Sequence, residues 1–198
     1  MKGSVETLFI SFDIEADGET PALHSMIALG AVAFVRSGRE VSTWQSNIMQ
    51  RADRTPSARC MNEFWRQHPD AWAEVLAGPK TPRDAMMSFA TWYAELKTTY
   101  TSIKFVAAPA AFDWQWLLAY YREFAPPSAP DLGYMATCVS TLREAYKLVR
   151  GRDARTCDEL AGGANACPHN PLSDARYQMR TFLALVEDLE ATDTGALV

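Results

Sequence analysis

The sequence is short of paired cysteines and of long apolar runs. Its cysteines, Cys60, Cys138, Cys157 and Cys167, include no C-x-x-C pair, which argues against a zinc ribbon or a thioredoxin-type site. We expect them to be reduced thiols of a cytoplasmic protein. The longest uncharged apolar run, MIALGAVAFV, is about half of what a membrane-spanning helix needs. The first residues lack the pattern of a secretory signal, so we expect a soluble protein without a membrane partner.

Excess basic charge is also absent. The net charge of −5 argues against a protein that coats nucleic acid through a basic surface. It does not exclude an enzyme that handles nucleic acid through bound cations. The chain has 198 residues, of which 48% are apolar, and this is enough to bury a core of its own. We therefore expect one domain over residues 1–198.

Hydrophobic periodicity indicates a sheet first and helices later. From Leu8 to Ile14, apolar and polar side chains alternate, as in a strand with one buried face. Thr81, Pro82 and Asp84 form a helix start signal. The remaining expected elements are strands at 26–35, 40–49 and 102–108, and helices at about 81–96, 112–124, 139–149 and 175–189. Hairpin-connected strands followed by strand and helix units predict an α/β fold, with a mixed sheet packed with helices.

The stretch FISFDIEADGETP places acidic residues at alternate positions at the end of the first strand. A calcium loop of the helix-loop-helix type is one interpretation, but its third position is Glu15 and its twelfth is His24, which do not match the pattern. A solvated strand end is the simplest alternative. Asp13 and Glu15 would project from the same face with Cα atoms about 6.6 Å apart, a spacing that allows them to share cations.

Two later motifs add acidic residues and a histidine. AAFDWQWLL places Asp113 where a buried strand meets an apolar helix, and PHNPLSDAR places His169 five residues before Asp174. Each has a simpler explanation. Asp113 could be a carboxylate that the helix dipole favours, and His169 could be an ordinary loop residue.

Together, in this order, the motifs FDIEADG, AFDWQWL and HNPLSD resemble those of the DEDDh family of 3'-5' exonucleases, from Phe9 to about Arg176. The sibling class requires a tyrosine where this chain has Asn170, so the histidine class is favoured. The resemblance implies an RNase H-like mixed β-sheet flanked by α-helices. It also implies a metal-dependent enzyme that releases 5'-mononucleotides from 3' ends of single-stranded DNA or RNA. One alternative is a catalytically inactive nucleic-acid-binding or scaffold module of the same fold. The other is an RNase H-like endonuclease, which is disfavoured because its set of carboxylates includes no pair that matches the His-x4-Asp of this chain.

The resemblance also implies roles for single residues. Phosphodiester hydrolysis by two cations needs several carboxylates, because Mg²⁺ and Mn²⁺ take oxygen ligands. The catalytic residues would be Asp13, Glu15, Asp113 and Asp174 as ligands of the two divalent cations, and His169 as the general base.

Recognition of the strand end would involve residues from Ala16 to Leu23. Phe64 and Trp65 are candidates for stacking on bases, and a helix packed on the core is the alternative explanation for both. Many relatives carry an asparagine a few residues before the second-motif aspartate, where this chain has VAAPAAFD. Several relatives pair, so a homodimer is compatible with the resemblance.

Overall fold

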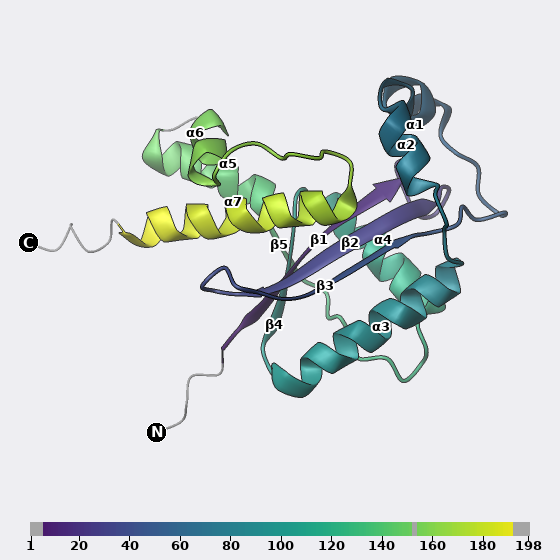
Figure 1. The fold of residues 1–198 in the computed structure, drawn as a ribbon, viewed down its shortest axis with the longest axis horizontal. Helices are drawn as coiled ribbons and strands as arrows, with labels where there is room; N and C mark the ends of the chain where they lie inside the picture. The colour runs from purple at the N-terminus through teal and green to yellow at the C-terminus, as the bar shows by residue number, and fades with distance from the viewer. Residues whose placement is uncertain (1–5, 152–153, 192–198) are drawn as a thin grey trace, which may run out of the picture.

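A five-stranded mixed sheet forms the centre of the computed structural model, which describes residues 6–151 and 154–191 (Figure 1). Its strands are β1 (Leu8–Ala16), β2 (Met26–Val35), β3 (Glu40–Asn47), β4 (Ile103–Ala107) and β5 (Ala136–Cys138). Their order in the sheet is β3-β2-β1-β4-β5. The central strand β1 pairs antiparallel with β2 and parallel with β4. The expected mixed sheet is therefore confirmed.

Helices cover both faces of the sheet (Figure 1). One face packs against α3 (Pro82–Thr99) and α4 (Ala110–Phe124), and the other against α5 (Val139–Arg150) and α7 (Pro171–Ala191). The alternation along β1 explains this division, because Ile10 and Phe12 enter the first core and Phe9 packs in the second. Ser11, Asp13 and Glu15 have the same parity as Phe9 and so belong to the α7 face.

The remaining short helices are α1 (Ala58–Glu63), α2 (Pro69–Val75), α6 (Ala154–Leu160) and the 3₁₀ turn η1 (Trp65–Gln67). The periodicity did not predict α1 and α2, which are too short to show a helical pattern. The expected strand at 40–49 ends at Asn47, and Ile48 forms only an isolated bridge with Lys80. The start signal of α3 is confirmed, since the Thr81 side chain accepts a hydrogen bond from the backbone N–H of Asp84.

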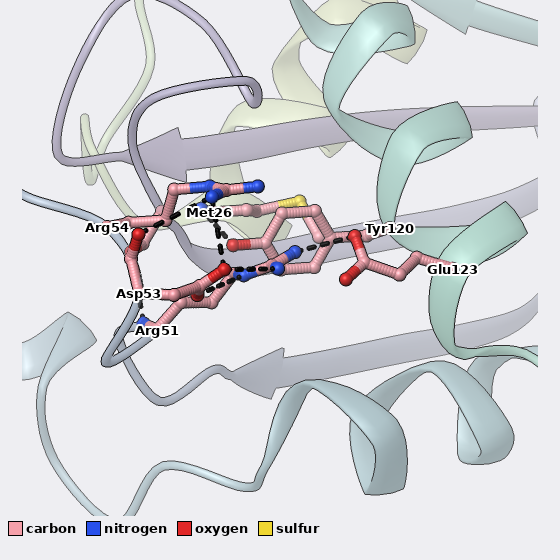
Figure 2. A network of polar contacts seen from close by, with 7 residues as sticks. Met26, Arg51, Asp53, Arg54, Tyr120 and Glu123 are labelled. Carbon is pink, nitrogen blue, oxygen red and sulfur yellow. Dashed lines mark hydrogen bonds and ion pairs between the residues drawn. The ribbon is translucent and has the colours of Figure 1, made fainter.

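Arg51 ties the segment between β3 and α1 to helix α4 (Figure 2). Its side chain is 11% exposed, and its guanidinium donates to Asp53 at 2.9 and 3.0 Å and to Glu123 at 2.6 Å. These partners raise the pKa of Arg51. The guanidinium also lies 5.1 Å from the centroid of the Phe124 ring. The segment that follows β3 is thus fixed beside α4.

None of the described helices is long and apolar enough to cross a membrane. All four cysteines are free thiols.

Candidate active site

Four acidic side chains from three elements meet at the end of β1. Asp13 and Glu15 lie on β1, Asp113 lies in the first turn of α4, and Asp174 lies in the first turn of α7. One carboxylate oxygen from each of Asp13, Glu15 and Asp174 lies within 4.8 Å of the others. Asp113 is 3% exposed, and its Oδ2 atom has no hydrogen-bond partner among the described residues. The fold thus brings together four acidic residues that lie up to 161 positions apart in the sequence.

Burial raises the pKa of all four carboxyl groups, and repulsion by neighbouring carboxylates adds to this for Asp13, Glu15 and Asp113. Burial is the largest cause and raises the pKa of Asp113 to about 7 and that of Asp174 to about 6. The pKa values of Asp13 and Glu15 are raised well above their usual range by burial and then by the neighbouring carboxylates. Carboxylate oxygens are the ligands that hard divalent cations take, and a cation would offset this repulsion. The residues therefore fit a divalent-cation site.

Gly30 on β2 allows the start of α7 to reach this end of the sheet. It is the register partner of Asp13 on β1. A Cβ atom at position 30 would lie 2.4 Å from the backbone nitrogen of Leu172 and 2.4 Å from the carbonyl carbon of Pro171. Real Cβ atoms essentially never approach other atoms below 3.0 Å. Glycine is therefore required for α7 to sit where it places Asp174 beside Asp13.

Hydrogen bonds fix the loop that leads into α7. The Asn165 amide donates to the carboxylate of Asp174 and accepts a 2.8 Å hydrogen bond from the Ser173 hydroxyl. Asn170 caps the helix, because its Oδ1 accepts from the backbone N–H of Ser173 at 3.0 Å. The Asn170 Nδ2 atom donates to Glu74 of α2 at 2.6 Å. Sequence reasoning missed Asn165, which lies in a loop where no regular spacing connects it to Asp174.

His169 precedes α7 in a left-handed backbone conformation, with φ of 65°. Its backbone N–H donates to the Asp174 carboxylate. Its ring centroid lies 4.2 Å from that of His68 and 4.9 Å from that of Phe64. Burial, followed by the neighbouring His68, lowers the pKa of His169. The backbone of His169 therefore lies beside the carboxylate cluster. Its ring, in contrast, packs against Phe64 and His68, on the side of the site formed by α1 and α2.

His68 belongs to none of the sequence motifs, but in the structure its ring contacts that of His169. Both rings line a cavity of about 400 Å³ beside α2. No spacing in the sequence connects these two histidines, since a hundred residues separate them.

A cavity of about 330 Å³ opens beside Glu15 and is lined by Ala16, Phe64 and Phe112 among others. Of the expected substrate-binding residues, Ala16 and Phe64 lie on this cavity, which is adjacent to the carboxylates. Leu23 is 62% exposed and lines a separate hollow together with Pro56.

The expectation for Trp65 needs correction. Its side chain is 2% exposed, and it packs against Ile27, Ala28 and Val75 in a small core. Its Nε1 atom donates to the backbone oxygen of Ala16 at 3.0 Å. The ring therefore has no free face for a base, and it supports the wall of the cavity instead.

Asp17, the third acidic residue of the first motif, holds a loop in place. It is fully buried and accepts hydrogen bonds from the Ser25 backbone N–H at 2.6 Å and from Gln50 Nε2 at 2.8 Å. Its backbone oxygen accepts from the Ser57 N–H at 2.8 Å. Asp17 thus joins the segment after β1 to the segment that Arg51 anchors to α4.

Comparison with known protein families gives one match that covers most of the chain. A family model described as the 3'-5' exoribonuclease Rv2179c-like domain matches residues 8–186. No curated protein sequence matches the chain.

Solved structures show the same fold. The nuclease domain of 3'hExo, a DEDDh family member bound to rAMP, aligns with a TM-score of 0.61 at 14% identity, over 94% of each chain. Pop2p of S. pombe, solved in a Mg²⁺- and Mn²⁺-bound form, aligns with a TM-score of 0.58 at 14% identity, over 96% of this chain and 86% of its own. E. coli ExoI in complex with single-stranded DNA aligns with a TM-score of 0.62 at 16% identity. That alignment covers 94% of this chain and only 42% of ExoI. The mixed sheet flanked by helices is therefore an RNase H-like exonuclease fold.

Proposed function

The chain belongs to the Rv2179c-like 3'-5' exoribonuclease domain family and is a 3'-5' exonuclease, and from this premise we propose that it hydrolyses single-stranded 3' ends to 5'-mononucleotides. The observation that carries this proposal is the group of four carboxylates at the end of β1, of which Glu15 and Asp113 are buried and Asp13 and Asp174 half-buried. The description of the family as exoribonucleases supports RNA as the substrate. An inactive scaffold of the same fold would have no need to keep such mutually repelling acidic residues close together.

Asp13, Glu15, Asp113 and Asp174 would hold two divalent cations, with Mg²⁺ or Mn²⁺ as the metals. Pop2p, which shares the fold, has been solved with both of these ions. Two bound cations supply stabilisation of charge on the attacking and leaving oxygens of a phosphodiester. Carboxylate oxygens on β1, α4 and α7 would hold the cations in place. Their raised pKa values mean that cation binding would be accompanied by release of protons.

His169 would act as the general base that accepts the proton of the attacking water. Its lowered pKa keeps the imidazole neutral near pH 7, and a neutral ring is the form that can accept a proton. In the present conformation the ring lies against His68 and Phe64. Catalysis would therefore require the ring to rotate from these aromatic neighbours toward the carboxylates when substrate is bound.

The cavity beside Glu15 would hold the terminal nucleoside. Phe64 on its wall is the aromatic ring available for base stacking, in place of the buried Trp65. Leu23, in the neighbouring hollow, is exposed enough to contact the preceding nucleotide. Because Asp17 and Arg51 fix the segments around the cavity, little ordering of the protein would be needed on binding.

Labelled oligonucleotides test this proposal. Matched single-stranded RNA and DNA, each with a 5' label, are incubated with the pure protein and Mg²⁺, with and without a chelator. We expect stepwise shortening from the 3' end that needs the metal and is faster on RNA. The Asp113→Asn variant, which keeps the shape of the side chain, is the inactive control. Internal cleavage, or binding without cleavage in the wild type, would contradict the proposal.

A further inference from the structure

One buried polar side chain beside the carboxylates has no role in the reaction described above. Gln178 lies on α7, four residues after Asp174 and so on the same face of the helix. It is 6% exposed, and its Nε2 atom donates a 2.7 Å hydrogen bond to Oδ1 of Asp13 on β1. Gln178 therefore connects the helix that carries Asp174 to the strand that carries Asp13.

The hydrogen bond acts on the orientation of the Asp13 carboxylate. It holds Oδ1 at a defined position and so restricts rotation of the carboxylate plane. One carboxylate oxygen of Asp13 lies within 4.8 Å of oxygens of Glu15 and Asp174, so holding the carboxylate in place keeps these groups arranged to share a cation.

The other end of the amide indicates that stability alone does not explain Gln178. Its Oε1 atom is buried and has no hydrogen-bond partner among the described residues. A buried amide oxygen without a partner is unfavourable, and an apolar side chain of similar size would avoid this cost. The orientation of the amide is nevertheless determined, because turning it would place Oε1 against the carboxylate of Asp13. The amide nitrogen of Gln178 thus binds Asp13, while its amide oxygen stays buried without a partner among the described residues.

We infer that Gln178 is a positioning residue, which orients Asp13 for cation binding without itself contacting the cation or the substrate. The inference rests on the proposed function, since it assumes that Asp13 binds a cation. Groups that orient metal ligands in this way typically contribute about 10- to 100-fold to metal affinity or activity.

The experiment compares Gln178→Met, which keeps the volume but removes the donor, with Gln178→Asn, which keeps the amide but is too short to reach Asp13. Thr181→Val is the matched control, because Thr181 is 1% exposed on the same helix and donates to the Tyr177 backbone oxygen rather than to a carboxylate. Mn²⁺ binding is measured by calorimetry without substrate, and thermal melts in chelator show whether each variant folds. Activity is measured as a function of Mn²⁺ concentration.

We expect Mn²⁺ to bind about 10- to 100-fold more weakly to both Gln178 variants and with wild-type affinity to Thr181→Val. Saturating Mn²⁺ should restore most of kcat in the Gln178 variants, while KM for the oligonucleotide stays unchanged. A folded Gln178→Met protein with wild-type Mn²⁺ affinity would overturn the inference but leave the proposed function intact. Failure of both variants to fold would make Gln178 a stability residue and would overturn it too. If the wild type bound no Mn²⁺, the inference and the proposed function would fail together.

Discussion

Replacing Gly30 with alanine should displace the start of α7 and thereby weaken the metal site. The added Cβ would lie 2.4 Å from the Leu172 nitrogen and the Pro171 carbonyl carbon, whereas ordinary contacts begin at 3.4 Å. Both contacting atoms belong to the backbone, so no side-chain rotation can relieve the overlap. The backbone at residues 171–172 must therefore move by about 1 Å, and Asp174 follows two residues later. A misplacement of about 1 Å in a catalytic arrangement can lower the rate by about 10².

Stability and activity should respond differently to this change. Overpacking costs about 1 to 3 kcal/mol of unfolding free energy, which a folded domain of this size can tolerate. We expect the Gly30→Ala variant to fold, to melt at a lower temperature, and to lose about 10² in kcat measured on a 3'-end substrate with saturating Mg²⁺. Raising the Mg²⁺ concentration should not restore activity, because the defect is a displaced ligand.

The matched control is Ala31→Val, the next residue of β2. Ala31 packs in the core formed with α3 and α4, on the opposite face of the sheet, so its enlargement should cost stability without moving α7. If Gly30→Ala and Ala31→Val destabilised the protein equally and both kept wild-type kcat, the argument from close approach would be refuted. The same conclusion would follow if Gly30→Ala bound Mn²⁺ as tightly as the wild type.

The remaining predictions concern protons, the base and the cavity. Because folding raises the pKa of Asp113 to about 7, its contribution to stability is full below about pH 4 and is lost as the pH rises through 7. The metal-free wild type should therefore melt progressively below Asp113→Asn as the pH rises from about 4 to about 7, with no further change above that. Saturating Mg²⁺ should reduce the difference, and parallel melting curves would contradict this. His169→Ala should lower kcat by about 10² to 10⁴ with little change in substrate Kd, and a near-normal kcat would exclude it as the base. Phe64→Ala should weaken oligonucleotide binding by about 1 to 3 kcal/mol if the ring stacks on a base. Phe112 lines the same cavity, so Phe112→Ala is the control that shows whether removing any aromatic ring from the cavity wall weakens binding as much.

Local patterns were sufficient for the elements that carry the acidic residues. Alternation along β1 separates the face of Ile10 and Phe12 from the face of Asp13, and the structure places these faces in different layers. The start signal at Thr81 likewise depends only on neighbouring residues. Such features are encoded within a few positions, and so they can be read before any tertiary contact is known.

The residues that support the site depend on contacts between distant segments. Nothing near Gly30 in the sequence indicates that the backbone of Leu172 will lie against it. Phe64 and Trp65 are adjacent aromatic residues in a region of short helices, where no repeating pattern shows which one faces inward. Gln178 is an intermediate case, because a glutamine one helical turn after Asp174, among apolar neighbours, could have been recognised as pointing toward the same site.

The placement of Asp174 on α7 has a consequence for the protein during its synthesis. The strand with Asp13 and Glu15 leaves the ribosome first, and Asp113 follows about a hundred residues later. A nascent chain that has reached α6 therefore contains three of the four carboxylates but lacks both His169 and Asp174. It cannot assemble the proposed site. If the proposed function is correct, hydrolytic activity would begin only after α7, the last helix of the described chain, has packed on the sheet.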